Sequence, residues 1–130
     1  MPTFRDPTAD SREAYEAIRG LAHATIFIEQ PHEAYGVILE LLGGVRSLQQ
    51  VFDQLAAMHE RHQGRAFNDA GDQHAGMVDA FTAADRLHET AAMIRRAESL
   101  LDAAAQAAGR IAWHPAEPAA PEVVNRPAWV

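Results

Sequence analysis

The chain has 130 residues, a formal net charge of −7 and no cysteine. This length is enough for one domain with a single core. The lack of cysteine excludes disulfides, thiolate metal sites and cysteine nucleophiles. The negative charge disfavours a general nucleic-acid binder, which needs a basic face to neutralise phosphates. All 11 basic residues are arginine, so lysine Schiff-base chemistry and a P-loop lysine are also excluded.

The sequence carries no signal for membrane insertion. No segment approaches the roughly 20 apolar residues that a membrane-spanning helix needs. The first residues also lack the apolar core of a signal peptide. We therefore expect a cytoplasmic protein that makes no use of a membrane.

The first predicted elements are an N-terminal arm and a helix. Residues 1–9 include two prolines and no periodicity, which predicts an extended arm. A helix is predicted after Asp10, whose carboxylate would accept a hydrogen bond from a backbone amide of the first turn while Glu13 reaches back. This helix should end near Glu29, because the residue before Pro31 is biased away from helical geometry.

A long second helix is predicted from Pro31 to Gln63, with Gly64 as the left-handed residue that closes it. Its apolar residues alternate in steps of four and three, and they are Ala34, Ile38, Leu41, Val45, Leu48, Phe52 and Leu55. Such a heptad stripe is typical of a coiled coil and needs a partner helix. A break at the pair Gly43-Gly44 would divide this helix and give four helices in total. The unbroken phase of the stripe favours one continuous helix.

The segment from Arg65 to Gly71 is rich in turn residues and predicts the loop of a hairpin. A third helix is predicted from about Gly71 to Ala108, ended by Gly109. Its apolar residues recur every three or four positions, and they are Met77, Phe81, Ala84, Leu87, Ala91, Ile94, Ala97, Leu101, Ala104 and Ala108. The predicted fold is therefore all-α, with three long helices forming an antiparallel helical hairpin or bundle over residues 1–109.

Residues 110–130 form a different segment, rich in proline and carrying Trp113 and Trp129. Proline at this density forbids helix and favours an extended polyproline arm. A flexible tail is one interpretation. The other is an arm that docks on its own bundle, on a neighbouring subunit or on another protein, because exposed tryptophan is costly.

Three histidines raise the possibility of a metal site. His59 and His62 continue the apolar stripe of the second helix, and a hairpin would bring His74 near them. Three imidazoles suit zinc or another divalent ion. The alternative is that the stripe simply becomes polar where the bundle opens to solvent. The spacing lacks the His-Glu-x-x-His motif of zinc proteases, which favours that alternative.

We expect a non-enzymatic assembly or adaptor protein that forms a homodimer or higher homo-oligomer, with no cofactor and no catalytic residue. One short helix cannot cover the outer flanks of two helices about 50 Å long. The residues predicted to make these contacts are Val37, Val51, Met58, Val78, Met93, Leu100, Trp113 and Trp129. The alternatives are a metal-binding bundle, acting as an enzyme or a sensor through His59, His62 and His74, and a nucleic-acid-associated regulator, which the charge disfavours.

Overall fold

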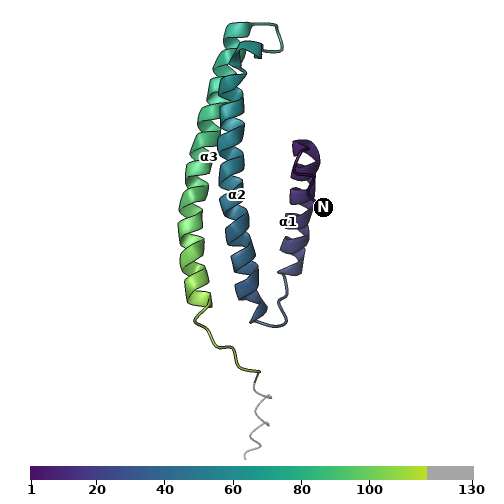
Figure 1. Cartoon of the computed structure of the whole chain (residues 1–130), viewed down its shortest axis with the longest axis vertical. Helices are drawn as coiled ribbons and strands as arrows, with labels where there is room; N and C mark the ends of the chain where they lie inside the picture. The colour runs from purple at the N-terminus through teal and green to yellow at the C-terminus, as the bar shows by residue number, and fades with distance from the viewer. Residues whose placement is uncertain (117–130) are drawn as a thin grey trace, which may run out of the picture.

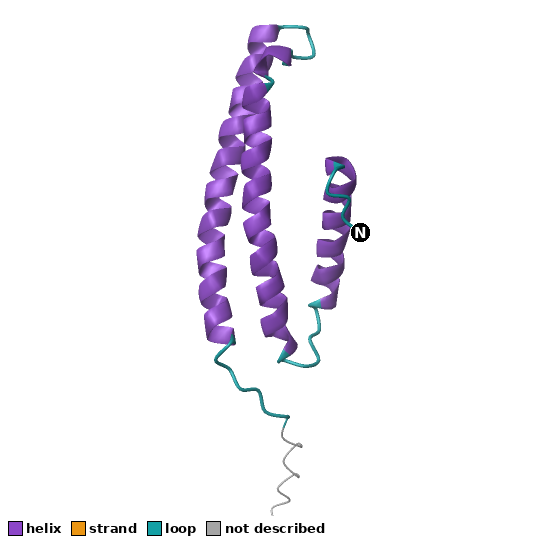
Figure 2. Ribbon diagram, in the orientation of Figure 1, coloured by secondary structure: helices purple, strands orange, loops and turns teal. Residues whose placement is uncertain are grey.

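The computed structural model describes residues 1–116, and within them every regular element is a helix. The elements are α1 (Pro7–Ala24), α2 (Glu33–Arg61), the short 3-10 helix η1 (Gln63–Arg65) and α3 (Gln73–Ala108) (Figures 1 and 2). The predicted all-α class is confirmed. In this part of the chain no helix is both long enough and apolar enough to span a bilayer.

Helix α1 begins four residues earlier than predicted, because its N-cap is Asp6 and not Asp10. The Asp6 carboxylate accepts a hydrogen bond from the amide of Ala9 at 3.1 Å. The Asp10 carboxylate instead accepts from the amide of Thr3 at 2.7 Å and from that of Phe4 at 3.1 Å. These bonds fold the first residues back onto α1, so the predicted extended arm over residues 1–9 is wrong. Helix α1 also ends at Ala24, before the predicted Glu29.

Helix α2 is continuous through Gly43-Gly44, so the chain has three α-helices within the described residues and not four. It begins two residues after Pro31 and ends at Arg61. The predicted left-handed residue Gly64 lies instead within η1. Among the described glycines, the positive φ of 83° belongs to Gly71.

The turn between η1 and α3 is organised by Asn68. Its side-chain oxygen accepts hydrogen bonds from the amides of Ala70 at 3.0 Å and Asp72 at 2.8 Å. Asp72 is the N-cap of α3, and its carboxylate accepts from the amide of Ala75 at 3.2 Å. These local bonds reverse the chain sharply, so that α3 starts beside the end of α2.

Helices α2 and α3 lie side by side and run in opposite directions (Figure 1). Two ion pairs between the helices agree with opposite directions, because the later residue of α2 pairs with the earlier residue of α3. Arg46 pairs with Glu98 at 2.7 Å, and Asp53 lies 3.9 Å from Arg95. The most buried positions between the two helices are mostly small, and they are Leu42, Ala56, Ala80, Ala84, Ala91 and Ala105. Alanine allows close approach of the helices but buries little apolar area.

The seam that faces α3 differs from the predicted one at three of its seven positions. Leu42 is 5% exposed and Ala56 is fully buried, whereas Leu41, Leu48 and Leu55 remain exposed. The predicted stripe combined residues from two neighbouring stripes of α2, one that faces α3 and one that does not. The two stripes are hard to separate from the sequence, because consecutive residues lie only about 100° apart around a helix. Helix α2 therefore turns Leu42 towards α3 and Leu41 away from it.

Helix α1 is not packed into a bundle with the other two helices. No Cα atom of α1 lies within 8 Å of one in α2 or α3, which leaves α1 outside the packed pair. Tyr15 is 63% exposed and Ile18 is 60% exposed, as expected for a helix whose apolar side has no neighbour. After α3, residues 111–116 have no regular structure and Trp113 is half-exposed. Trp129 lies outside the described residues.

Candidate functional site

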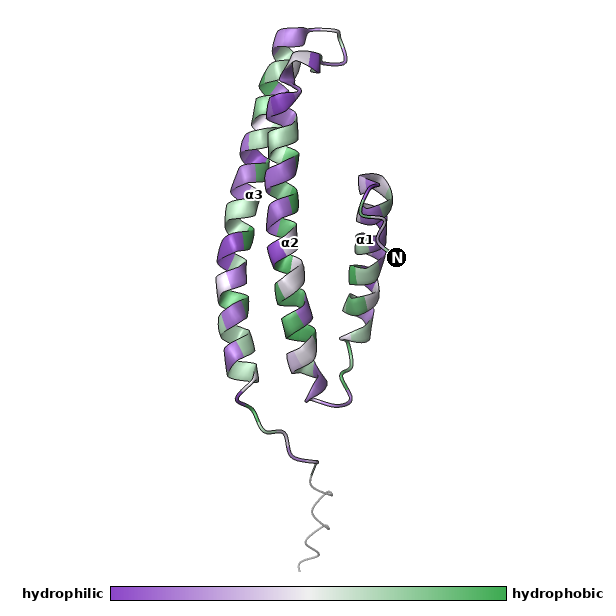
Figure 3. Ribbon diagram, in the orientation of Figure 1, coloured by the Kyte–Doolittle hydropathy of each residue, from purple (hydrophilic) through white to green (hydrophobic). Residues whose placement is uncertain are grey.

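Helix α2 carries a second apolar stripe beside the one that faces α3. It alternates in steps of four and three, and we call it the outer stripe, made of Val37, Leu41, Gly44, Leu48, Val51, Leu55 and Met58. The side chains of Leu41, Leu48, Val51 and Leu55 are between 37% and 44% exposed. In Figure 3 hydrophobic and hydrophilic segments alternate along the whole helix. Helix α2 is thus apolar on two sides, and only one of them is covered.

Helix α3 adds apolar residues to the same side of the pair. Met93 and Leu100 are 70% and 67% exposed. They lie about 100° or more around α3 from the positions that face α2, as the outer stripe does on α2. Because the two helices run in opposite directions, both sets point to the same side. Together they form what we call the open face, which comprises the outer stripe with Ala83, Met93, Ala97, Leu100 and Ala104.

The open face is large enough for a protein interface. Helix α2 has 29 residues, which makes it about 43 Å long, and two helices side by side are about 20 Å wide. The resulting rectangle of about 850 Å² includes the first turns of α2, beside which Leu21 of α1 stands. It is of the same order as the area of about 800 Å² that each partner buries in a standard stable complex.

A cavity of about 520 Å³ lies where α1 stands beside the first turns of α2. Leu21 of α1 forms one wall, and Val37 and Leu41 of the outer stripe belong to the other. The remaining lining residues are Glu33, Gly36 and Glu40. The open face therefore continues into an apolar cleft with two carboxylates beside it.

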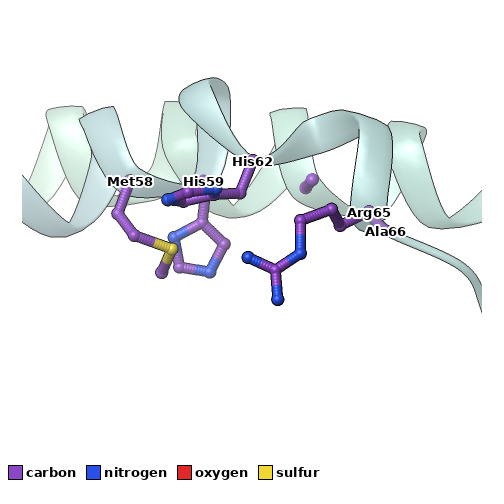
Figure 4. Close-up of a pocket in the computed structure, with 6 residues that line it drawn as sticks. Met58, His59, His62, Arg65 and Ala66 are labelled. Atoms are coloured by element: carbon purple, nitrogen blue, oxygen red, sulfur yellow. The ribbon is translucent and has the colours of Figure 1, made fainter.

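The three histidines of the predicted metal site are placed differently from one another. His59 and His62 line a cavity of about 350 Å³ together with Met58 and Arg65, whereas His74 is not among its lining residues (Figure 4). The His59 Nδ1 atom lies 2.7 Å from the carbonyl oxygen of Leu55. Within residues 1–116 no group of three or more His, Asp or Glu side chains has the geometry to hold a metal ion. The metal site therefore stays a prediction, with two of its three ligands in one cavity.

Sequence reasoning missed a charged cluster around His88 of α3. Its Nδ1 atom lies 3.2 Å from Asp53 Oδ1, and its Nε2 atom lies 2.9 Å from Glu60 Oε1. The hydrogen bond with Asp53, followed by that with Glu60, raises the pKa of His88 above its usual value. Protonated His88 donates both N–H groups and links α3 to two turns of α2. Only the register of α2 against α3 brings these residues together, so no local motif signals them.

Five of the eight predicted interaction residues lie on the open face, and they are Val37, Val51, Met58, Met93 and Leu100. Val78 is half-exposed and lies about four helical turns before Met93 along α3, with the charged Asp85 on its side of the helix between them, so we do not include it in the open face. Trp113 follows α3 and is half-exposed. Trp129 lies outside the described residues, so its predicted contact has no structural counterpart.

Comparison of the chain with protein-family models, with curated proteins and with solved structures finds no match.

Proposed function

We propose that this chain is a non-enzymatic assembly or adaptor protein that works as a homo-oligomer through its open face. The observation that supports the proposal is the outer stripe, four of whose large residues are more than a third exposed along α2. A regular heptad stripe pairs with another helix when one is available. Within the described residues, neither α1 nor α3 packs against it.

The energetics favour association of this face with a second copy. Burial of apolar surface contributes about 25 cal/mol per Å² to stability. Covering the exposed leucine-rich stripe would therefore contribute a large favourable free energy to association. The packed pair α2 and α3 has mostly alanine at its fully covered positions. A two-fold axis that sets two copies against each other beyond the cleft with α1 would bury this part of both open faces, and two-fold dimers are the commonest homo-oligomers.

Light scattering on the full chain at tens of micromolar tests the proposal. We expect the mass of a dimer or a higher oligomer. The double variant Leu48→Glu/Leu55→Glu should be monomeric, because it places two charges in the middle of the outer stripe. The control is Gln50→Glu/Gln54→Glu, which adds the same charge on the exposed side of α2 away from this stripe.

The control variant should keep the mass of the parent protein. A parent protein that is monomeric at these concentrations would remove the proposal. An oligomer that both double variants dissociate equally would also contradict it, because net charge and not the open face would then control assembly.

The metal-binding alternative depends on His59 and His62, which share the cavity in Figure 4. The guanidinium of Arg65 lines the same cavity, and its positive charge opposes a divalent cation there. Elemental analysis of the purified protein decides this alternative. A stoichiometric metal that is lost in His59→Ala and in His62→Ala would favour it over simple assembly.

A further inference from the structure

The cleft between α1 and α2 has the size and lining of a site for one aromatic side chain. Its volume is about 520 Å³, and its apolar walls are Leu21 of α1 and, on α2, Val37 and Leu41. A Cβ atom at Gly36, which also lines the cleft, would meet no other atom within 4 Å. Pockets of about 300–1,000 Å³ with mostly apolar walls are typical of sites that bind small organic groups. The cleft therefore has room for an indole or phenyl ring.

Two carboxylates give the cleft a negative rim. Glu33 and Glu40 both line it and are seven residues apart, so they lie on one side of α2, two helical turns apart. Neither forms an ion pair with another residue of the described range 1–116. A suitable occupant of the cleft therefore combines a large apolar ring with a nearby positive charge.

Residues 117–130 have this combination in their sequence, and they lie outside the described part of the chain. Their one aromatic residue is Trp129, and their one positively charged residue is Arg126, three positions earlier. Three residues span at most about 11 Å, so the guanidinium can reach a carboxylate at the rim while the indole ring lies in the cleft. Tryptophan that stays in water also forgoes one of the largest hydrophobic contributions that any side chain makes.

The end of α3 brings the chain close to the cleft. A Cβ atom at Gly109 would lie 3.1 Å from the ring of Tyr35, which precedes Gly36 in the first turn of α2, and Figure 1 shows α3 ending beside the start of α2. An extended chain spans at most about 3.6 Å per residue, so residues 110–116 lead at most about 25 Å away from Gly109, whereas residues 117–129 can span about 47 Å. The surplus of about 22 Å exceeds the diameter of a helix, about 10–12 Å, so Trp129 can return to the cleft.

We propose that Trp129 of the same chain occupies the cleft, with Arg126 paired to Glu33. Arg126 comes before Trp129 along the chain, and Glu33 is the rim carboxylate nearer to Tyr35 and the end of α3. The indole ring then contacts both walls of the cleft and joins α1 to α2, whose Cα atoms do not come within 8 Å of each other. The outer stripe beyond Leu41 stays open, so docking of Trp129 is independent of the proposed self-association.

Fluorescence of Trp129 tests the proposal in the variant Trp113→Phe, which removes the other tryptophan of the chain. We expect emission at a shorter wavelength than in urea-unfolded protein and several-fold slower quenching by acrylamide, because the cleft shields the ring from water. Leu21→Glu, added to this variant, should abolish both effects because it places a charge in the cleft. The matched control is Phe27→Glu, since Phe27 is 76% exposed in the connection from α1 to α2 and does not line the cleft.

Unfolded-like emission of Trp129 in Trp113→Phe would overturn the proposal, and so would an equal loss of shielding in Leu21→Glu and Phe27→Glu. The double variant Leu48→Glu/Leu55→Glu separates this inference from the proposed function, because it should be monomeric. Trp129 should stay shielded in it, and exposure of Trp129 there would overturn docking within one chain in favour of a second copy. A monomeric parent protein with a shielded Trp129 would remove the proposed function and leave this inference standing.

A charge exchange provides a second readout. Arg126→Glu should speed the quenching of Trp129 several-fold at low salt, because it brings a third negative charge to the rim, and adding Glu33→Arg should restore the slow rate. Faster quenching that Glu33→Arg does not reverse would contradict the pairing with Glu33, and so would unchanged quenching in Arg126→Glu.

Discussion

Gly76 of α3 lies directly against the backbone of Phe67, and a Cβ atom at position 76 would overlap the Cα and N atoms of Phe67. This contact holds the turn after η1 against the first turns of α3. Because the obstructing atoms belong to the backbone, no rotation of a side chain can relieve the overlap.

We predict that Gly76→Ala destabilises the protein by about 1–3 kcal/mol, the range typical of overpacking. The gain in helix propensity from alanine, about 1 kcal/mol or less, is too small to offset this. Gly43→Ala is the matched control, because a Cβ there meets nothing within 4 Å. It should stabilise α2 by about 0.5–1 kcal/mol. Urea unfolding followed by circular dichroism measures both, and equal effects of the two variants would disprove the close contact.

Leu42 is the largest buried side chain among the described residues. We predict that Leu42→Ala lowers the free energy of unfolding by about 2–4 kcal/mol, through lost burial and the cavity it leaves. The control is Leu39→Ala on the same helix, since Leu39 is 44% exposed and lies on neither stripe. Leu39→Ala should lower the free energy of unfolding by less than about 1 kcal/mol, because an exposed side chain loses little buried apolar area. Denaturation at a fixed protein concentration compares the two, and a larger loss for Leu39→Ala would contradict the register of α2.

The imidazole of His88, held between Asp53 and Glu60, makes stability depend on pH. Its pKa is raised in the folded chain above the ordinary value of 6.5, because Asp53 and Glu60 both accept hydrogen bonds from the protonated ring. The stabilising contribution of His88 is therefore fully present below pH 6.5, while both carboxylates stay ionised, and it is lost as pH rises through the raised pKa. We predict that the parent protein exceeds His88→Gln in stability by more at pH 6 than at pH 9.

Thermal unfolding of both proteins at the two pH values measures this difference. An NMR titration of the His88 ring supplies an independent check, because Asp53→Asn should lower its pKa towards the ordinary value. A stability difference that stays constant between pH 6 and pH 9 would argue against the bridge.

The beginning of α1 depends on Asp6 and not on Asp10. We predict that Asp6→Ala raises the hydrogen-exchange rates of the first amides of α1 about fivefold, as expected for loss of an N-cap worth about 1 kcal/mol. Global stability should change little, because α1 is not packed against α2 or α3. Asp10→Asn should instead expose the amides of Thr3 and Phe4, which bond that carboxylate. Hydrogen exchange read by NMR distinguishes the two effects residue by residue.

The all-helical class and the approximate length of each helix could be predicted from periodicity, because alternation in steps of three and four reflects the backbone geometry of a single helix. The same reasoning found the turn near Gly71 and named five residues that we place on the open face, whereas it assigned Leu41, Leu48 and Leu55 to the seam with α3. It failed at the start of α1, where Asp6 and Asp10 are both good caps by composition. The choice between them depends on where residues 3 and 4 fold back.

By itself, then, the sequence determined which segments are helices and that α2 must have apolar neighbours. Only the tertiary structure decided that Leu42 faces α3 while Leu41 stays uncovered, that α1 stands apart, and that His88 meets Asp53 and Glu60. The physical reason is that helix periodicity is a local property of the backbone. Which stripe of a helix faces a neighbouring helix depends on how the two helices pack. Here two adjacent stripes of α2 are almost equally apolar.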